Sequence, residues 1–481
     1  MAKRITRATV KAAAPPRSKQ HARVRHEPPN RKFLQQEEQQ MSKLIGVHVS
    51  AAGGPACAVR NVAKLGPFAR SFAFFIRPRL TWKPVPPFRE AQVTKFHELL
   101  GCGRCSPSDE GSGAESPSRQ QQVQLAHVVV HASYLINLGS HDPELRAKSI
   151  ELMLEEVRKC EQLGVPLYVF HPGSCGVPPK SPGDLKARAK ARKKKLKPPA
   201  DQADDEENGK QELADMQQKQ QRRRLESIGF VADGVVNVLR ATSKVALVVE
   251  AMSGQGTTLG ATFEELRAIL DAVDRRYRQD HEPESKRTEA SVSDRVGVCL
   301  DTCHVFASGW EMDTPAKCNA MLAAFDANMC PKWPQALKVL HLNDSKASCG
   351  SRVDRHANIG HGAIGLSAFR WIMNHKRFDN VPMILETPRP KKKARKTGNM
   401  KLIGSADADS SGDDRKPKRK PLKRKRVAIE EETRAYEDDE DGDLVAEDSV
   451  QAALKKEEEN EMAPSAMEEL ALLHNLIETG A

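Results

Sequence analysis

Residues 296–304 read VGVCLDTCH, an apolar run that stops at an acidic residue. The run from Val296 to Leu300 contains almost no polar atom, which suits a parallel strand buried on both faces. Asp301 ends the run, and His304 follows three residues later. The stretch therefore predicts a buried parallel strand whose end carries side chains able to bind a cation.

The same pattern occurs eight times along the chain. The predicted strands are Leu44–Val49, Ser71–Ile76, His127–His131, Leu167–His171, Val245–Glu250, Val296–Asp301, Val339–Leu342 and Pro382–Glu386. Stretches with the apolar spacing of amphipathic helices lie between them, for example Asp142–Leu163, Thr262–Val273 and Gly365–Asn374. Eight strand-then-helix units predict an α/β fold, a closed parallel (β/α)₈ barrel, with a doubly wound open sheet as the alternative.

The composition shows that much of the chain lies outside such a barrel. The 481 residues are 39% hydrophobic and 29% charged, too polar for the whole chain to offset its ordering entropy by burial. Five polar segments look disordered or inserted: 1–40, 105–122, 177–222, 278–293 and 388–481. They leave 267 residues, close to the roughly 250 of a barrel. We expect one barrel domain over 41–387, interrupted at 105–122, 177–222 and 278–293.

Charge is divided sharply in the C-terminal region. Residues 388–426 hold 16 basic and 4 acidic side chains, whereas the tail at 427–481 holds 3 basic and 18 acidic ones. The basic clusters at 391–396 and 416–426 suit a nuclear import receptor, so we expect the nucleus. The basic N-terminal extension has no acid before residue 27, which makes mitochondria a second expected location.

Other classes of protein are excluded or disfavoured. No run of 18 apolar residues is present, so we expect no membrane-spanning segment and no membrane partner. No N-terminal segment has the pattern of a secretory signal. The ten cysteines are scattered irregularly, which indicates reduced thiols rather than a disulfide framework.

Six consecutive predicted strands end on a histidine or a carboxylate. These residues are His131, His171, Glu250, Asp301, His341 and Glu386. In a parallel barrel they converge on the face where active sites are built. So many carboxylates and imidazoles would repel one another or stay unsatisfied without cations. Histidine and carboxylate ligands suit catalytic zinc or manganese.

The loops add three more candidate ligands. His304 follows Asp301 by three residues, and Asp354 and His356 are two apart, so that both can face one ion in an extended loop. We expect the adjacent Cys303 to be a packing residue. Nine ligands accommodate two or three metal ions, and such clusters hydrolyse phosphodiesters by holding both the attacking and the leaving oxygen.

At these positions the sequence resembles the endonuclease IV family of apurinic/apyrimidinic (AP) endonucleases. Besides Glu250 and Gly260, the matching motifs are GVHVSAAGG at 46–54, HASYLINLG at 131–139, FHPGS at 170–174, GQG at 254–256, VCLDTCH at 298–304, HLNDSK at 341–346, RVDRH at 352–356 and LET at 385–387. Nine ligands matched in order make this resemblance specific.

The resemblance implies a TIM barrel with three zinc ions per chain, manganese being able to replace zinc at one site. By motif, His131 and His171 would bind the first ion, Glu250 would bridge the first and second as the catalytic carboxylate, Asp301, His341 and Glu386 would complete the second, and His304, Asp354 and His356 would bind the third. The implied reaction is hydrolysis 5′ to an abasic site, leaving a 3′-hydroxyl and a 5′-deoxyribose phosphate, with trimming of blocked 3′ ends, in base excision repair.

The resemblance also implies a partner, double-stranded DNA with abasic sites or blocked 3′ ends, bound by a monomer. The side chains expected to contact DNA are Tyr134, Arg77, Arg79, Trp82, Gln255 and Arg355. Leu80 stands where the family inserts an arginine into DNA, so the wedge geometry is in question. We further expect the basic insertion at 180–197 to add phosphate contacts.

Two other functions remain open at this point. A metal-dependent sugar isomerase or epimerase on a related barrel would also place histidines and carboxylates at strand ends. The third ligand set and the basic extensions speak against it. A non-catalytic DNA-binding or scaffold protein is the other alternative, but a scaffold has no physical need for nine ligands.

Overall fold

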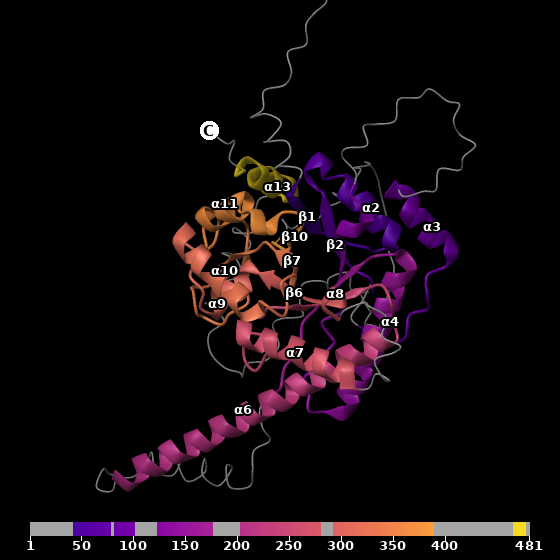
Figure 1. Cartoon of the computed structure of the whole chain (residues 1–481). Coiled ribbons are helices and arrows are strands. Elements are labelled where there is room, and N and C mark those ends of the chain that lie inside the picture. Colours follow the sequence, from indigo (N-terminus) through magenta and orange to yellow (C-terminus); the bar gives the residue numbers. More distant parts are fainter. Residues whose placement is uncertain are drawn as a thin grey trace, which may run out of the picture.

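The computed structural model describes residues 42–77, 81–101, 123–176, 203–279, 292–388 and 465–477. Eight parallel strands close into a barrel in the order β1-β10-β7-β6-β5-β4-β3-β2, and helices surround it (Figure 1). The strands are β1 Leu44–His48, β2 Ser71–Phe75, β3 Val128–His131, β4 Leu167–Phe170, β5 Ala246–Glu250, β6 Val296–Asp301, β7 Leu337–His341 and β10 Pro382–Leu385. The predicted closed barrel is confirmed, and the open sheet is wrong.

Alternation along each strand separates an inner layer of side chains from an outer one. One fully buried residue from each of seven strands fills the barrel interior: Ala73, Val129, Val169, Val248, Cys299, Val339 and Ile384. On β1 the corresponding position is Gly46, where a Cβ would lie 1.8 Å from the carbonyl oxygen of Ser71. The outward side chains pack under the helices in the larger core.

The helices expected from apolar spacing form where predicted. They and the other helices are α2 Pro55–Ala63, α3 Glu90–Leu99, α4 Pro143–Leu163, α6 Ala203–Arg240, α7 Phe263–Gln279, α8 Val292–Arg295, α9 Thr302–Ser308, α10 Pro315–Met329, α11 Leu366–Asn374 and α13 Ala466–Asn475. Short 3₁₀ turns are η1 Gly66–Phe68, η3 Leu125–His127 and η5 Lys376–Phe378. In the described part of the chain, no helix is both long and apolar enough to span a bilayer.

Two expectations about disorder are wrong. The segment 177–222 was expected to be a disordered insertion, but α6 begins at Ala203 and runs as one long helix that extends well beyond the barrel (Figure 1). The segment 427–481 was expected to be a disordered acidic tail, but it contains α13, whose Leu470 and Leu473 are fully buried. The leucines on one face of this short helix are enough to bury it, although the composition of the whole segment is acidic.

The remaining polar segments lie outside the described residues. These are the N-terminal extension 1–40, the insertion 105–122, residues 177–202 of the second insertion, 280–291 of the third and 389–464. The basic stretch 180–197 and both basic clusters, 391–396 and 416–426, fall within them.

Candidate metal centre

Six of the nine candidate ligands, those expected at strand ends, occupy the layer directly above the barrel interior. Each lies two residues after an interior side chain of the same strand, as His131 follows Val129 and Glu250 follows Val248. Since side chains alternate, a shift of two residues keeps the same inward direction. His171 and Glu386 were expected to close their strands but lie one residue beyond β4 and β10. The strand register therefore brings all six strand-end residues to one end of the barrel.

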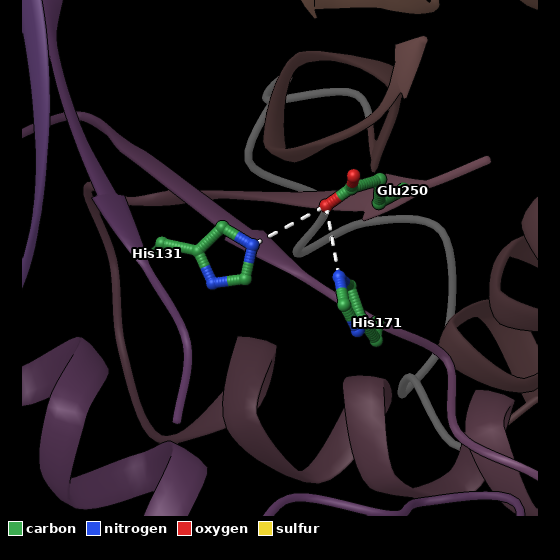
Figure 2. Close-up of side chains that lie close together, drawn as sticks. All are labelled: His131, His171 and Glu250. Carbon is green, nitrogen blue, oxygen red and sulfur yellow. Dashed lines mark ion pairs between the residues drawn. The ribbon is translucent and has the colours of Figure 1, made fainter. Parts of the chain in front are cut away.

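The first group consists of His131, His171 and Glu250 (Figure 2). Glu250 Oε2 lies 3.3 Å from Nε2 of His131 and 3.2 Å from Nε2 of His171. His131 Nδ1 lies 2.9 Å from the carbonyl oxygen of Ala132. A carbonyl only accepts, so Nδ1 carries the proton and Nε2 is left to bind an ion.

The second group shares Glu250 with the first and adds Asp301, His341 and Glu386. His341 Nδ1 lies 3.1 Å from Glu250 Oε1, 3.3 Å from Glu386 Oε2 and 3.8 Å from Asp301 Oδ2. Asp301 Oδ1 accepts the backbone N–H of His304 at 3.0 Å and so caps α9. One carboxylate thus orders the helix that carries His304 and offers its other oxygen to the second group.

The third group consists of His304, Asp354 and His356. His304 Nε2 lies 3.0 Å from Asp354 Oδ2, and His356 Nε2 lies 3.3 Å from Asp354 Oδ1. The other ring nitrogen of each histidine faces a carbonyl oxygen, that of Ala251 for His304 and that of Glu386 for His356. These backbone contacts orient both rings toward Asp354, as outer contacts do in metal sites.

Cys303 also reaches this region, with Sγ near Asp301 and His356. Burial raises the pKa of the Cys303 thiol to about 12. A buried thiol of that kind is inert and behaves as a small apolar side chain, which supports the packing role expected for it.

Neighbouring opposite charges lower the pKa of a carboxylate and raise the pKa of a histidine in the first two groups. Burial would raise the pKa of Glu250, but the charges of His341 and His171 outweigh it and hold that pKa well below its usual range. Burial would lower the pKa of His131, but contact with Glu250 and the charge of Glu386 raise it. Without an ion, protons on imidazoles neutralise the carboxylates, and a bound ion takes their place.

The third group behaves in the same way. Burial alone would lower the pKa of His356, but the charge of Asp301 and contact with Asp354 raise it to about 9. Burial would raise the pKa of Asp354, but the charge of His304 and contact with both histidines hold it far below its usual range. The negative charge of the carboxylates and the positive charge of the protonated histidines therefore balance one another in the third group.

The donor atoms fit metal ions. Within each group they all lie within 4.8 Å of one another. Four of them, His131 Nε2, Glu250 Oε2, His304 Nε2 and His356 Nε2, are buried and complete no hydrogen bond with any described residue. Buried polar atoms that complete no hydrogen bond are costly even beside an opposite charge, and imidazole with carboxylate oxygen is the donor set of zinc and manganese.

Of the side chains expected to contact DNA, four are exposed at the surface. Tyr134 is 41% exposed and its ring lies 5.3 Å from that of His131 and 5.4 Å from that of His171. Trp82 is also 41% exposed. Gln255 and Arg355 are exposed beside the third group, and Gln255 Oε1 accepts the N–H of Asp354 at 3.1 Å. Arg79 lies outside the described residues.

The structure gives Arg77 a role within the protein that does not favour the DNA contact expected for it. Arg77 is only 5% exposed; it donates to the carbonyl oxygens of Thr81 and Lys83 and pairs with Glu155 at 3.2 Å. Its guanidinium is occupied in holding the start and end of the 77–83 loop together. No local feature of the sequence signals this, because Glu155 lies far along the chain.

Three supporting residues were not expected from the sequence. His48 ends β1 beside Phe75, with ring centroids 4.5 Å apart, and these two form the side of the layer without ligands. Their positions, two after Gly46 and Ala73, were the available signal. Asn343 donates to Asp301 Oδ2 at 2.5 Å and accepts the N–H of Glu386 at 3.0 Å. Its place two residues after His341 was the only hint.

Comparison with known proteins identifies the family. The family described as xylose isomerase-like TIM barrel matches residues 119–402. The chain is 35% identical over 346 residues to the probable endonuclease 4 of Chlorobium phaeovibrioides (strain DSM 265 / 1930), covering 72% of this chain and 94% of that protein. It is 34% identical over 350 residues to the apurinic-apyrimidinic endonuclease of Caenorhabditis elegans, covering 73% of this chain and 67% of that protein.

Among solved structures, endonuclease IV from Thermus thermophilus is 27% identical, with a TM-score of 0.46, and the match covers 72% of this chain and 92% of that one. The two sequence relatives are matched over at least two thirds of their length at more than 30% identity. The chain belongs to the endonuclease IV family of AP endonucleases.

Proposed function

We propose that this chain is a zinc-dependent DNA repair enzyme that hydrolyses the phosphodiester 5′ to an abasic site. The observation that carries the proposal is the sharing of Glu250 between two ligand groups, with a third group beside them. Ions about 3.5–4 Å apart suit phosphodiester hydrolysis. The names of the relatives, endonuclease 4 and apurinic-apyrimidinic endonuclease, supply the substrate class.

The residues divide the task among themselves. Zinc ions held here would polarise the phosphoryl oxygens and activate water near neutral pH. Glu250, which belongs to both the first and the second ligand group, would help to hold an ion at each. Asp354, His304 and His356 together would hold the third ion. Tyr134, exposed at the rim and in ring contact with His131 and His171, would pack against the DNA beside the lesion.

An abasic substrate suits such a deep, polar centre. Glu250, Asp301 and His341 are fully buried, so a duplex cannot reach them with its bases stacked. An abasic nucleotide stacks poorly, and extruding it costs less than flipping a paired base. Blocked 3′ ends offer the same phosphodiester, so we propose 3′-end trimming as a second activity. The expected products of incision are a 3′-hydroxyl and a 5′-deoxyribose phosphate.

Incision of a labelled duplex with one central abasic site tests the proposal. The wild type should cut 5′ to the lesion and leave a 3′ end that a polymerase extends. Outer contacts to metal ligands are worth about 10–100-fold, so Glu250→Gln, which replaces a shared ligand, should cost more than about 100-fold and release metal. Glu98→Gln, which removes an exposed carboxylate on α3, is the matched control.

Elemental analysis of the same samples counts zinc and manganese per chain. A zinc-loaded wild type that leaves abasic DNA intact but epimerises free sugars would contradict the proposal. The basic clusters at 391–396 and 416–426 support a nuclear location as part of it. Replacing those basic residues with glutamine in a fluorescent fusion should shift the protein to the cytoplasm, and unchanged nuclear signal would contradict that part.

A further inference from the structure

The helix α13, which follows the charged segment 389–464 in the sequence, packs against the barrel. It packs beside α11, β1 and η1, next to the strand β10 (Figure 1). Ser465 begins it with a capping box, in which Ser465 Oγ accepts the N–H of Glu468 and Glu468 accepts the N–H of Ser465. In a (β/α)₈ barrel this is the position of the helix that follows the eighth strand.

A carboxylate lies in the middle of the buried face of α13. Glu469 is fully buried, as are Leu470 and Leu473 of the same helix. Its Oε2 accepts a hydrogen bond from Thr387 Oγ1 at 2.6 Å, and its Oε1 accepts the N–H of Ile359 at 2.9 Å. Burying a carboxylate is unfavourable unless hydrogen bonds compensate it, so packing alone would favour a leucine here.

Each of the two bonded segments carries a metal-site ligand. Thr387 directly follows Glu386 of the second group, and Ile359 lies three residues after His356 of the third. The two segments are also tied to each other. His356 Nδ1 lies 3.3 Å from the carbonyl oxygen of Glu386, and Asn358 Nδ2 donates to that of Pro388 at 3.1 Å.

We propose that Glu469 is a positioning residue that holds Glu386 and His356 in register for the second and third ions. The inference rests on the proposed metal-dependent function of the same site. The first group shares Glu250 with the second, but its two histidines, His131 and His171, come from the ends of β3 and β4 on the other side of the barrel. Loss of Glu469 should therefore loosen two ions and spare the first.

The test uses the full-length protein and the variants Glu469→Ala, Glu469→Gln and Thr387→Val. Native mass spectrometry counts zinc ions per chain during stepwise chelation, and chelator competition gives the zinc dissociation constants. Glu469→Ala and Thr387→Val should weaken two of the three ions by about 10–100-fold, the usual effect of an outer contact. Glu469→Gln keeps one acceptor oxygen and should lie between them and the wild type.

Two control variants separate positioning from packing. Glu468→Gln removes the exposed neighbouring carboxylate and should leave zinc affinity unchanged. Leu473→Ala removes buried apolar contacts and should lower the melting temperature of the metal-free protein without changing zinc affinity well below that temperature. On abasic duplex, Glu469→Ala should lower kcat more than it raises KM.

The outcomes are distinguishable from failure of the proposed function. If the wild type binds no zinc and cuts no abasic DNA, the function itself is wrong. If the wild type binds three zinc ions and cuts, while Thr387→Val and Glu469→Gln bind all three with unchanged affinity, the positioning role is overturned. Thr387→Val leaves α13 untouched, so the test stands even if Glu469→Ala does not fold.

Discussion

Asn343 Nδ2 lies 2.5 Å from Oδ2 of Asp301, and the amide oxygen of Asn343 accepts the N–H of Glu386 at 3.0 Å. One fully buried amide thus fixes two members of the second ligand group. Only a side chain that both donates and accepts can make these bonds, so neither an aspartate nor a leucine replaces it.

Asn343→Ala should lower kcat/KM for abasic incision by about 10–100-fold and weaken zinc at the second group. Chelator competition and steady-state incision measure the two effects. Asn328→Ala removes an amide of the same kind on α10, where it bonds to the carbonyl oxygen of Ala324, and serves as the control. Equal zinc affinity in Asn343→Ala and the wild type would show that Asp301 and Glu386 hold their places unaided.

The variants Arg77→Ala and Trp82→Ala should have opposite effects: the first should lower protein stability, and the second should weaken DNA binding. Arg77→Ala breaks a buried ion pair and two bonds to carbonyl oxygens, so it should destabilise the protein by about 2–3 kcal/mol. Since its guanidinium is buried and bound to the protein, the slope of log affinity for abasic DNA against log salt should stay as in the wild type.

Trp82→Ala should do the opposite, because its ring is partly exposed. We expect weaker binding of abasic duplex, by about 1 kcal/mol or more, at an unchanged melting temperature. Thermal unfolding and fluorescence anisotropy over a salt series measure both variants. A salt slope smaller by about 1 in Arg77→Ala would restore Arg77 as a phosphate contact.

The metal ligands and Arg77 differ in how far the sequence alone could predict their roles. The ligands were predictable because every second strand residue faces the barrel interior, and the carboxyl ends of parallel strands all meet at one end of the barrel. Arg77 was not, since its partner Glu155 meets it only in the folded chain. A basic residue close to an exposed tryptophan has the same local pattern whether it faces DNA or carbonyl oxygens.

The helices α6 and α13 were missed for different reasons. The sequence of residues 203–222 has only Leu213 and Met216 as large apolar residues, so no apolar period marks a helix there, and the helix-forming tendency of Ala, Glu, Gln and Lys was the remaining signal. In α13 the leucines and the capping residues Ser465 and Glu468 were a proper local signal. The acidic composition around them outweighed that signal in the prediction.

Glu156 should make stability depend on pH. It is fully buried, accepting from Tyr168 Oη at 2.7 Å and from the N–H of Ser133 at 3.1 Å, and burial raises its pKa from 4.5 to about 7. The folded protein therefore binds this proton more tightly than the unfolded chain. Its contribution to stability is complete below pH 4.5 and is lost as pH rises to about 7, by up to about 3 kcal/mol.

Glu156→Gln keeps an oxygen that accepts from Tyr168 and Ser133 but cannot ionise. Its stability relative to the wild type should therefore rise between about pH 5 and pH 7 and level off above. Denaturant unfolding of zinc-saturated wild type and variant across this range measures the difference, in which other titrating groups cancel. A difference that does not change with pH would show that the carboxyl is ionised throughout.

The chain between β10 and α13 should be dispensable for the metal centre, whereas α13 itself should not. Thr387 Oγ1 lies 2.6 Å from Glu469, which is about one helical turn from Ser465, so the ends of the 389–464 segment lie close together. A flexible linker of about six residues spans such a gap. Replacing 389–464 by this linker should leave zinc content and abasic incision close to those of the wild type.

Truncation after Pro388 removes the same charged segment and α13 as well, exposing the apolar surface that Leu470 and Leu473 cover. It should therefore lower the melting temperature by many degrees and release zinc from the second and third groups. Comparable activity in the two shortened chains would mean that α13 contributes nothing to the barrel or its metal centre.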